Sequence, residues 1–150
     1  MAYHDFLHDF EETIRTATAR LQEISADNSG KSANGEWSAK QIVGHLIDSA
    51  ANNHQRFVRA QQSDPLVMPG YEQNHWVSSQ GYQEADWSHL VTLWMHLNLH
   101  LVDVIGHLPP DKYSVACVIG DSQPLTLEAL VIDYLRHLQH HIAQIRPTLA

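Results

Sequence analysis

The sequence has little of several features that mark common protein classes. A single cysteine, Cys117, excludes an internal disulfide framework and fits a reducing compartment. Lys and Arg number only nine against 17 acidic residues, and no basic stripe is visible, so nucleic-acid binding is not expected. The apolar runs are too short to span a bilayer, and the first ten residues lack the basic start and apolar run of a signal peptide. These absences predict a soluble, cytoplasmic protein.

The rest of the composition is typical of one globular domain. A chain of 150 residues with a hydrophobic fraction of 43% has a common domain size and enough apolar side chains for one core. We therefore expect a single domain over residues 1–150. Histidine is the unusual component, because its twelve copies outnumber Lys and Arg together. It is the commonest metal-binding side chain, so the positions of these histidines on the predicted elements decide what they indicate.

Four segments have the apolar periodicity of long amphipathic helices. They are residues 3–24, 37–62, 84–108 and 126–146. Ser38 and Gln41 have the spacing of a capping box at the start of the second helix, and Thr126 is the predicted N-cap of the last. Together these segments predict an all-α four-helix bundle. The connection at residues 63–83 is long and typical of a lid or pocket wall, and residues 113–119 could form a short extended piece.

The sequence also predicts where the first helix ends and which face of the third helix is buried. The residues from Asp27 to Gly30 are expected to break the first helix, with a polar loop following through Gly35. The buried stripe predicted for the third helix consists of Leu90, Leu93, Leu97, Leu101, Val104 and Leu108.

The last predicted helix carries two inward histidines. Because a helix advances about 100° per residue, each histidine has an angle from the apolar stripe, which is centred on Tyr134. His141 lies about 20° and His137 about 60° from that centre, whereas His140 lies about 120° away and faces solvent. An inward i, i+4 pair has Cβ atoms about 6 Å apart and can converge on one metal ion. The alternative is that both rings are buried, neutral and hydrogen-bonded without a metal.

The third helix has a similar pair that is less well placed. Measured from Leu97, His100 lies about 60° and His96 about 100° from the centre of the stripe. This pair is therefore expected to be exposed or at the edge of a groove.

His45 is the candidate for a third ligand on the second helix. It lies about 100° from the centre of that stripe, so periodicity alone places it at the surface or boundary. It begins a polar lane, formed by His45, Ser49, Asn52 and Arg56, along one flank of the helix. Such a lane faces either a pocket between helices or water.

Other chemistries have little support in the sequence. A di-iron carboxylate bundle needs repeated Glu-x-x-His elements on helices, but the one match, Glu72 to His75, lies in the predicted loop. No nucleophile elbow, phosphate loop or dinucleotide fingerprint occurs. Cys117 is interpreted as a core or pocket residue, and Tyr71 and Trp76 as candidates to line a pocket. The remaining tryptophans are interpreted as core or staple residues: Trp37, Trp87 and Trp94.

Two segments resemble the signature helices of the DinB/YfiT-like superfamily of metal-binding four-helix bundles. The segment from Trp37 to Asp48 matches its W-S-x-x-x-x-x-x-H-L-x-D helix, and the segment from His137 to Ile145 matches its H-x-x-x-H-x-x-Q-I terminal helix. The helix order and the long second connection also agree, so the resemblance covers nearly the whole chain.

In that family, one histidine of the second helix and two of the last helix hold a divalent ion, usually described as zinc or nickel. The resemblance therefore implies His45, His137 and His141 as metal ligands, and it alone promotes His45 from a boundary residue to a ligand. Three protein ligands leave one coordination position for water or substrate, which is typical of catalytic metal sites.

The resemblance also implies a reaction. Characterised relatives include transferases and isomerases that use low-molecular-weight thiols such as bacillithiol or mycothiol, and others are described as proposed metal-dependent hydrolases. We therefore expect a metal-dependent enzyme that joins a thiol cofactor to a small electrophilic molecule. A hydrolase, or a stress protein that binds a metal or small ligand without turnover, is the alternative.

No catalytic residue stands out beyond the metal itself. Asp48, Ser49, Asn52 and Arg56 are candidates to contact the metal ligands or the substrate, and the segment from Pro65 to Tyr82 would shape the substrate pocket. Related bundles commonly form dimers, so a homodimer is also expected, although no segment specifies an interface.

Overall fold

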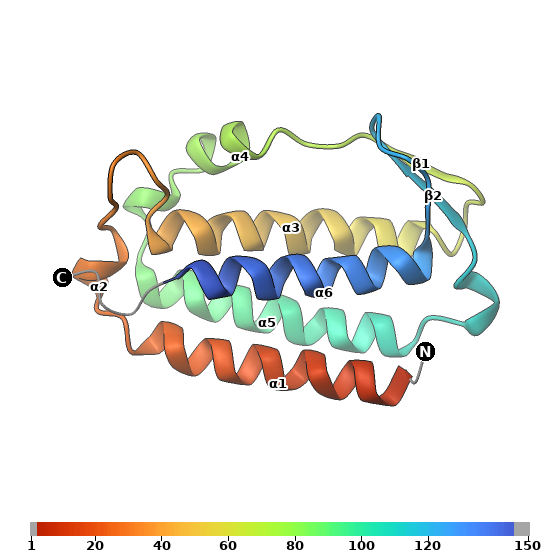
Figure 1. Ribbon diagram of the computed structural model, residues 1–150, viewed down its shortest axis with the longest axis horizontal. Coiled ribbons are helices and arrows are strands. Elements are labelled where there is room, and N and C mark those ends of the chain that lie inside the picture. The colour runs from red at the N-terminus through yellow and green to blue at the C-terminus, as the bar shows by residue number, and fades with distance from the viewer. Residues whose placement is uncertain (1–2, 146–150) are drawn as a thin grey trace.

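The computed structural model describes residues 3–145, and four long helices form its body (Figure 1). These helices are α1 (Tyr3–Gln22), α3 (Ala39–Arg59), α5 (Trp87–Gly106) and α6 (Leu127–Gln144). The predicted all-α four-helix bundle is therefore confirmed. The predicted end of the last helix at Arg146 lies outside the described residues, and α6 ends at Gln144.

The directions of the helices explain the long second connection. α3 and α5 are neighbours that run in the same direction, whereas α1 and α6 run in the opposite direction (Figure 1). Two parallel neighbours cannot be joined by a tight turn, so the chain must return along the length of the bundle between them. Residues 60–86 make this crossover.

The crossover contains short elements of its own. They are β1 (Leu66–Met68), α4 (Gln73–Ser79) and the 3-10 helix η1 (Tyr82–Glu84). α4 and η1 both contact α3, and Figure 1 shows the crossover running over that helix. It therefore covers one flank of α3.

A small sheet ties the crossover to the connection before α6. After the 3-10 helix η2 (Pro110–Lys112), β2 (Ala116–Ile119) pairs in parallel with β1 and antiparallel with β3 (Leu125–Thr126). The predicted extended piece at residues 113–119 is confirmed in part, because residues 116–119 form β2 whereas residues 113–114 form a turn. The sequence did not predict its partner strand β1.

The two predicted helix starts are confirmed by their hydrogen bonds. The Ser38 N–H donates to Gln41 Oε1 at 2.9 Å, and the Gln41 N–H donates to Ser38 Oγ at 3.2 Å, which completes the capping box of α3. At α6, the Ala129 N–H donates to Thr126 Oγ1 at 3.1 Å. The bonds donated by Gln41 and Ala129 satisfy amide groups that the first turn of each helix leaves without a partner.

The predicted loop after the first helix was partly wrong. Residues Ala26–Ser29 form the one-turn helix α2, because Ser25 caps it by accepting from the Asn28 N–H at 3.1 Å. The polar loop begins only after this turn.

The predicted buried stripe of the third helix was also partly wrong. Leu93 is exposed, and Leu97 and Val104 are only half-buried. The most deeply buried side chains of α5 are Trp94, Asn98, Leu101 and Ile105. Because this helix is apolar on most of its circumference, leucine spacing alone did not identify the face that packs against α1 and α3.

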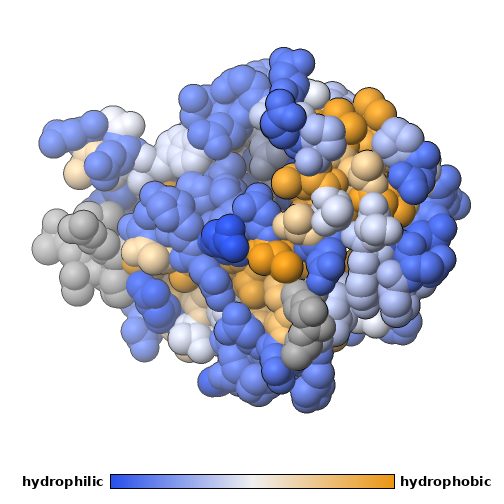
Figure 2. All heavy atoms as spheres, turned by 45° about the vertical axis from the view of Figure 1, so that its right-hand side comes forward, coloured by the Kyte–Doolittle hydropathy of each residue, from blue (hydrophilic) through white to orange (hydrophobic). Residues whose placement is uncertain are grey.

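The surface carries both polar and apolar areas. The face shown in Figure 2 is mainly hydrophilic, with hydrophobic side chains gathered in patches. The exposed large apolar residues are Val58, Val67, Leu93, Leu99 and Leu125. Within residues 3–145, no helix combines the length and hydropathy that crossing a membrane requires. The expected homodimer stays a prediction.

Candidate metal centre

Three histidines from two antiparallel helices converge at one point between α3 and α6. The Nε2 atom of His137 lies 3.4 Å from Nε2 of His45 and 3.1 Å from Nε2 of His141. Within residues 3–145, these residues form the only group of three or more potential metal-binding side chains whose ligand atoms all lie within 4.8 Å of one another. Two tetrahedral ligands at 2.0–2.1 Å from zinc would lie about 3.3 Å apart, so this spacing fits one ion.

The surroundings keep the three rings neutral. Burial, together with the neighbouring rings of His141 and His137, lowers the pKa of His45 from 6.5 to about 4. Burial is also the main cause that lowers the pKa of His137 and of His141. A neutral imidazole has the lone pair that metal binding requires, so all three rings are in the binding form near neutral pH.

His45 is buried, contrary to the expectation from its helical angle. Only 2% of the residue is exposed, because α6 lies on one side of it and the Trp37 ring lies 5.1 Å from its ring centre on another. Its Nδ1 atom has no hydrogen-bond partner among the described residues. Burying an imidazole is costly unless its nitrogens are engaged, and an ion at Nε2, which faces His137, would engage one of the two.

His141 is oriented by a neighbour one turn further along α6. Its Nδ1 atom lies 2.9 Å from Gln144 Oε1, so an Nδ1–H donates to that oxygen and Nε2 keeps its lone pair toward the other rings. Gln144 is held in turn by His140, whose Nε2 lies 3.3 Å from Gln144 Nε2. Partners of this kind fix the tautomer and orientation of metal-binding histidines. Gln144 belongs to the motif of the terminal helix, but its role in orienting His141 was not predicted from the sequence.

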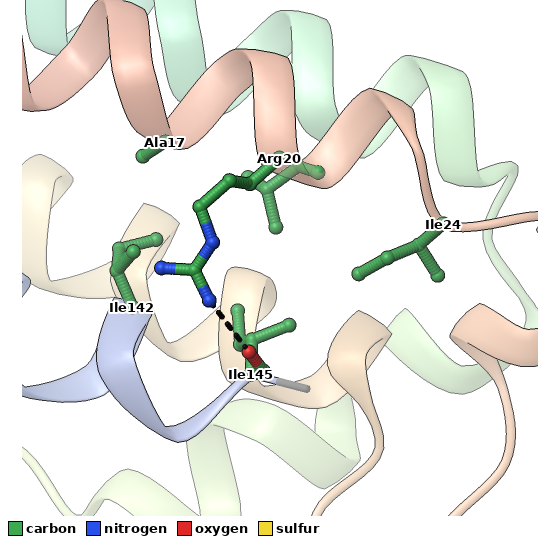
Figure 3. A pocket seen from close by; sticks show the side chains of 6 residues that line it. Ala17, Arg20, Ile24, Ile142 and Ile145 are labelled. Atoms are coloured by element: carbon green, nitrogen blue, oxygen red, sulfur yellow. Dashed lines mark hydrogen bonds between the residues drawn. The ribbon is translucent and has the colours of Figure 1, made fainter. Parts of the chain in front are cut away.

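The last turn of α6 is anchored to α1. Arg20 Nη2 donates to the carbonyl oxygen of Ile145 at 3.1 Å, and apolar side chains of both segments surround this bond (Figure 3). Ile142 and Ile145 are both buried, and each directly follows a residue of the histidine face, His141 and Gln144 respectively. The anchored apolar face therefore fixes the position of the histidine face.

A cleft of about 800 Å³ lies beside Trp37 and Gln144. Its lining residues are Ser32, Ala33, Glu36, Trp37, Ala39, Ile42, Ala143, Gln144 and Ile145. Two of them contact the centre, since Trp37 packs against His45 and Gln144 binds His141. A cleft of this size, with mixed apolar and polar walls, is typical of small-molecule sites.

The polar lane of α3 faces the protein interior rather than water. Ser49 and Arg56 are buried, and Asn52 is half-buried. Asp48, on the same side, is 2% exposed, and its Oδ1 accepts from the Tyr82 hydroxyl at 2.6 Å and from Gln80 Nε2 at 2.8 Å. The crossover thus covers the lane.

Other candidate residues have simpler environments. His96 and His100 are exposed, as expected, and the ring of His100 lies 5.2 Å from that of His54. Cys117 is buried in the core. Tyr71 and Trp76 are half-buried and contact each other within the crossover, with ring centres 5.2 Å apart.

The tryptophans divide between core and site. Trp87 and Trp94 are core residues, as expected. Trp37 is half-buried and forms a wall of the histidine centre, a role that was not predicted from the sequence.

The fold is a four-helix bundle in which α3 and α5 are parallel, and three imidazoles converge between two of its helices. These features define a class of helical proteins suited to bind a metal. The profile of the DinB superfamily matches residues 9–145, and the chain belongs to this superfamily. The resemblance found in the sequence is thus confirmed.

Several relatives share this similarity. A proposed metal-dependent hydrolase of Bacillus licheniformis is 25% identical over 134 residues, which cover 89% of this chain and 75% of the relative. YfiT of Bacillus subtilis, also named a proposed metal-dependent hydrolase, is 28% identical over 113 residues, which cover 74% of this chain and 63% of YfiT.

Solved structures show the same fold. The structure of YfiT from Bacillus subtilis, described as having an unusual four-helix bundle topology, matches with a TM-score of 0.86 and 22% identity over 95% of this chain and 83% of that chain. A mycothiol-dependent maleylpyruvate isomerase matches with a TM-score of 0.71 and 14% identity over 95% of this chain. This chain covers only 62% of the isomerase, so the isomerase has substantial further structure.

Proposed function

We propose that the protein is a metal-dependent enzyme in which His45, His137 and His141 bind one divalent ion, zinc or nickel. The convergence of three neutral imidazole Nε2 atoms carries this proposal. The bound ion would act as a Lewis acid that lowers the pKa of a coordinated thiol or water. Gln144 holds His141 in the binding tautomer, and Trp37 shields His45 from water.

The reaction proposed first is the transfer of a low-molecular-weight thiol to a small electrophile. The thiol loses its proton to solvent, its sulfur electron pair forms a bond to the electrophilic carbon, and the leaving group departs with the electrons of its former bond. The cleft lined by Trp37 and Gln144 is large enough for one such molecule, and a structural neighbour is named for its dependence on a thiol.

Hydrolysis is the second candidate, because several relatives are named proposed metal-dependent hydrolases. The nucleophile would then be water instead of a thiol. Among the described residues, the group of converging side chains contains no carboxylate that could act as a general base, so the ion itself would activate the nucleophile in either reaction. Binding of a metal or small ligand without turnover is the remaining alternative.

Metal content tests the centre directly. Protein purified without an affinity tag is expected to contain about one zinc or nickel ion per chain by elemental analysis. His141→Ala is expected to lose that ion, whereas His140→Ala, at the exposed neighbour, is expected to retain it with weaker binding. Stoichiometric metal in the His141→Ala protein would contradict the proposed centre.

Turnover separates the two reactions. Metal-loaded protein is incubated with a panel of thiols and an aryl halide, and separately with an activated ester without thiol. Thiol consumption that depends on His141 supports the transferase, and ester cleavage that depends on His141 without thiol supports the hydrolase. Inactivity in both assays with full metal content would favour binding without turnover.

A further inference from the structure

Arg56 is the one arginine or lysine among the buried residues of the described chain, with 8% of its surface exposed. The two ion pairs found within residues 3–145 join other residues, Arg15 with Glu12 and Lys31 with Asp27. No carboxylate therefore neutralises Arg56 in the described part of the protein. A buried guanidinium without a counter-ion destabilises a fold, because desolvation of the charge is not offset.

The guanidinium also has few hydrogen bonds. Its Nη1 donates to Asn53 Oδ1 at a long 3.5 Å, and its Nε is buried without a partner among the described residues. The Tyr71 ring centre lies 6.0 Å from its central carbon, which provides a weak cation–π contact. Burial lowers the pKa of Arg56, but a guanidinium stays protonated in proteins. The Nε–H thus lacks the acceptor that a buried donor requires, and the one side-chain hydrogen bond, from Nη1, is long.

Arg56 lies at the end of the polar lane that begins at the metal centre. It follows His45 by eleven residues on α3, which corresponds to about 16 Å along the helix axis. The side chains between them on this flank are polar: Asp48, Ser49 and Asn52. The crossover covers this flank with Tyr71, Gln80 and Tyr82.

We propose that Arg56 binds a carboxylate group of the small molecule that reacts at the three-histidine centre. A single guanidinium supplies one positive charge and a planar pair of donors, which matches one carboxylate better than a doubly charged phosphate. The flank between Arg56 and the three histidines is polar rather than apolar. That the same molecule reaches the metal rests on the proposed function, whereas carboxylate binding at Arg56 does not.

Anion binding by the metal-free protein tests the Arg56 site alone. Isotopically labelled protein is titrated with sodium hexanoate, with hexanol as the neutral analogue, and the NMR signals of the backbone amides around residue 56 on α3, which all variants share, are followed. We expect hexanoate to bind about tenfold more tightly to the native protein than to Arg56→Met, and hexanol to show no such difference. Equal hexanoate binding by both proteins, or none by the native protein, overturns the proposal. Tighter binding of inorganic phosphate than of hexanoate overturns the choice of a carboxylate.

A second arginine provides a matched control for this substitution. Arg59 lies three residues further along α3, is exposed and donates to Gln55 Oε1 at 2.9 Å. Arg59→Met is expected to bind hexanoate like the native protein. Arg56→Met is expected to unfold at the same or a higher temperature, because it removes an unpaired buried charge. A large loss of stability would instead show that Arg56 is structural and would overturn the proposal.

Thiol binding separates this proposal from the proposed function. Cobalt-loaded protein is titrated with mercaptohexanoate and mercaptohexanol, and sulfur binding is read from the thiolate-to-cobalt absorption band. A preference for the carboxylate that disappears in Arg56→Met assigns the carboxylate to the thiol. In a second outcome, both thiols give the absorption band with equal affinity while hexanoate binding still depends on Arg56. This outcome assigns the carboxylate to the electrophile. Arg56-dependent hexanoate binding without any band contradicts thiol transfer and leaves the Arg56 site intact.

Discussion

The tertiary environment of Asp48 changes the pKa of its carboxyl group. It is buried on α3, one turn from His45, and burial raises the pKa of its carboxyl even though Tyr82 and Gln80 donate hydrogen bonds to Oδ1. Its Oδ2 has no partner among the described residues. The folded protein therefore favours the protonated form more than the unfolded chain does.

This shift predicts a dependence of stability on pH. A carboxyl with a raised folded pKa contributes stability that is fully present below the unfolded pKa of 3.8 and is lost as pH rises through the folded pKa. Asp48→Asn keeps an acceptor for Tyr82 without the charge, so its stability relative to the native protein should increase from acidic to neutral pH. Urea unfolding of metal-free protein across this range measures the difference. An exposed control, Asp103→Asn, should show no such trend, and a trend of opposite sign for Asp48→Asn would contradict the prediction.

Gln144 acts through His141. Its removal leaves the Nδ1–H of His141 without its acceptor and frees the ring to rotate. We expect Gln144→Ala to weaken metal binding by about 10–100-fold with little change in stability, measured by competition with a chelating dye. Gln139→Ala is the matched control, because Gln139 is also on α6 and donates to Thr13 Oγ1 at 3.2 Å, away from the centre. Equal metal affinity of both variants would contradict the role of Gln144.

At the scale of elements, the crossover packs on α3 through a contact that needs glycine. A Cβ atom at Gly44 would lie 2.2 Å from Cδ2 of Tyr82, far inside the contact distance. The Tyr82 ring is held by the hydrogen bond from its hydroxyl to Asp48, so it cannot move freely. Glycine in the middle of a helix thus lets η1 approach α3 and cover the polar lane.

This contact predicts a loss of stability in Gly44→Ala. Alanine favours helices over glycine by up to about 1 kcal/mol, but overpacking against a held ring costs about 1–3 kcal/mol, so we expect net destabilisation in urea unfolding. Gly106→Ala is the control, because its Cβ would lie 3.6 Å from Leu7 Cδ1, an ordinary contact. A more stable Gly44→Ala protein would show that the crossover is loosely packed.

At the scale of the whole molecule, the histidine centre joins α3 to α6. These helices are distant in sequence, so an ion bound by His45, His137 and His141 would link them in the folded state only. Free metal at 100 times its dissociation constant would stabilise the fold by about 2.7 kcal/mol. In a chain of this size, that corresponds to a rise of several degrees in Tm.

Thermal unfolding measures this linkage. We expect a chelator to lower the Tm of the native protein by several degrees and to leave the Tm of His141→Ala nearly unchanged. His140→Ala should respond to the chelator in the same direction as the native protein. If the chelator has no effect on native protein that contains metal, the ion does not bind the folded state preferentially.

The sequence by itself determined the four long helices and two of the three candidate ligands. Local signals defined the starts of α3 and α6, because a cap depends on residues within one turn, as with Ser38 and Thr126. The angles of His137 and His141 also followed from local geometry, since both lie on one helix with a clear apolar stripe. The family resemblance added His45, and the structure brings all three together.

Only the tertiary structure decided what covers each helix face. The burial of His45 depends on Trp37 and α6, and that of Arg56 depends on the crossover, neither of which follows from the periodicity of α3. On α5, apolar side chains surround most of the helix, so its neighbours selected the buried face. A helix pattern records how residues are spaced along one element, whereas burial depends on contacts between residues far apart in the chain.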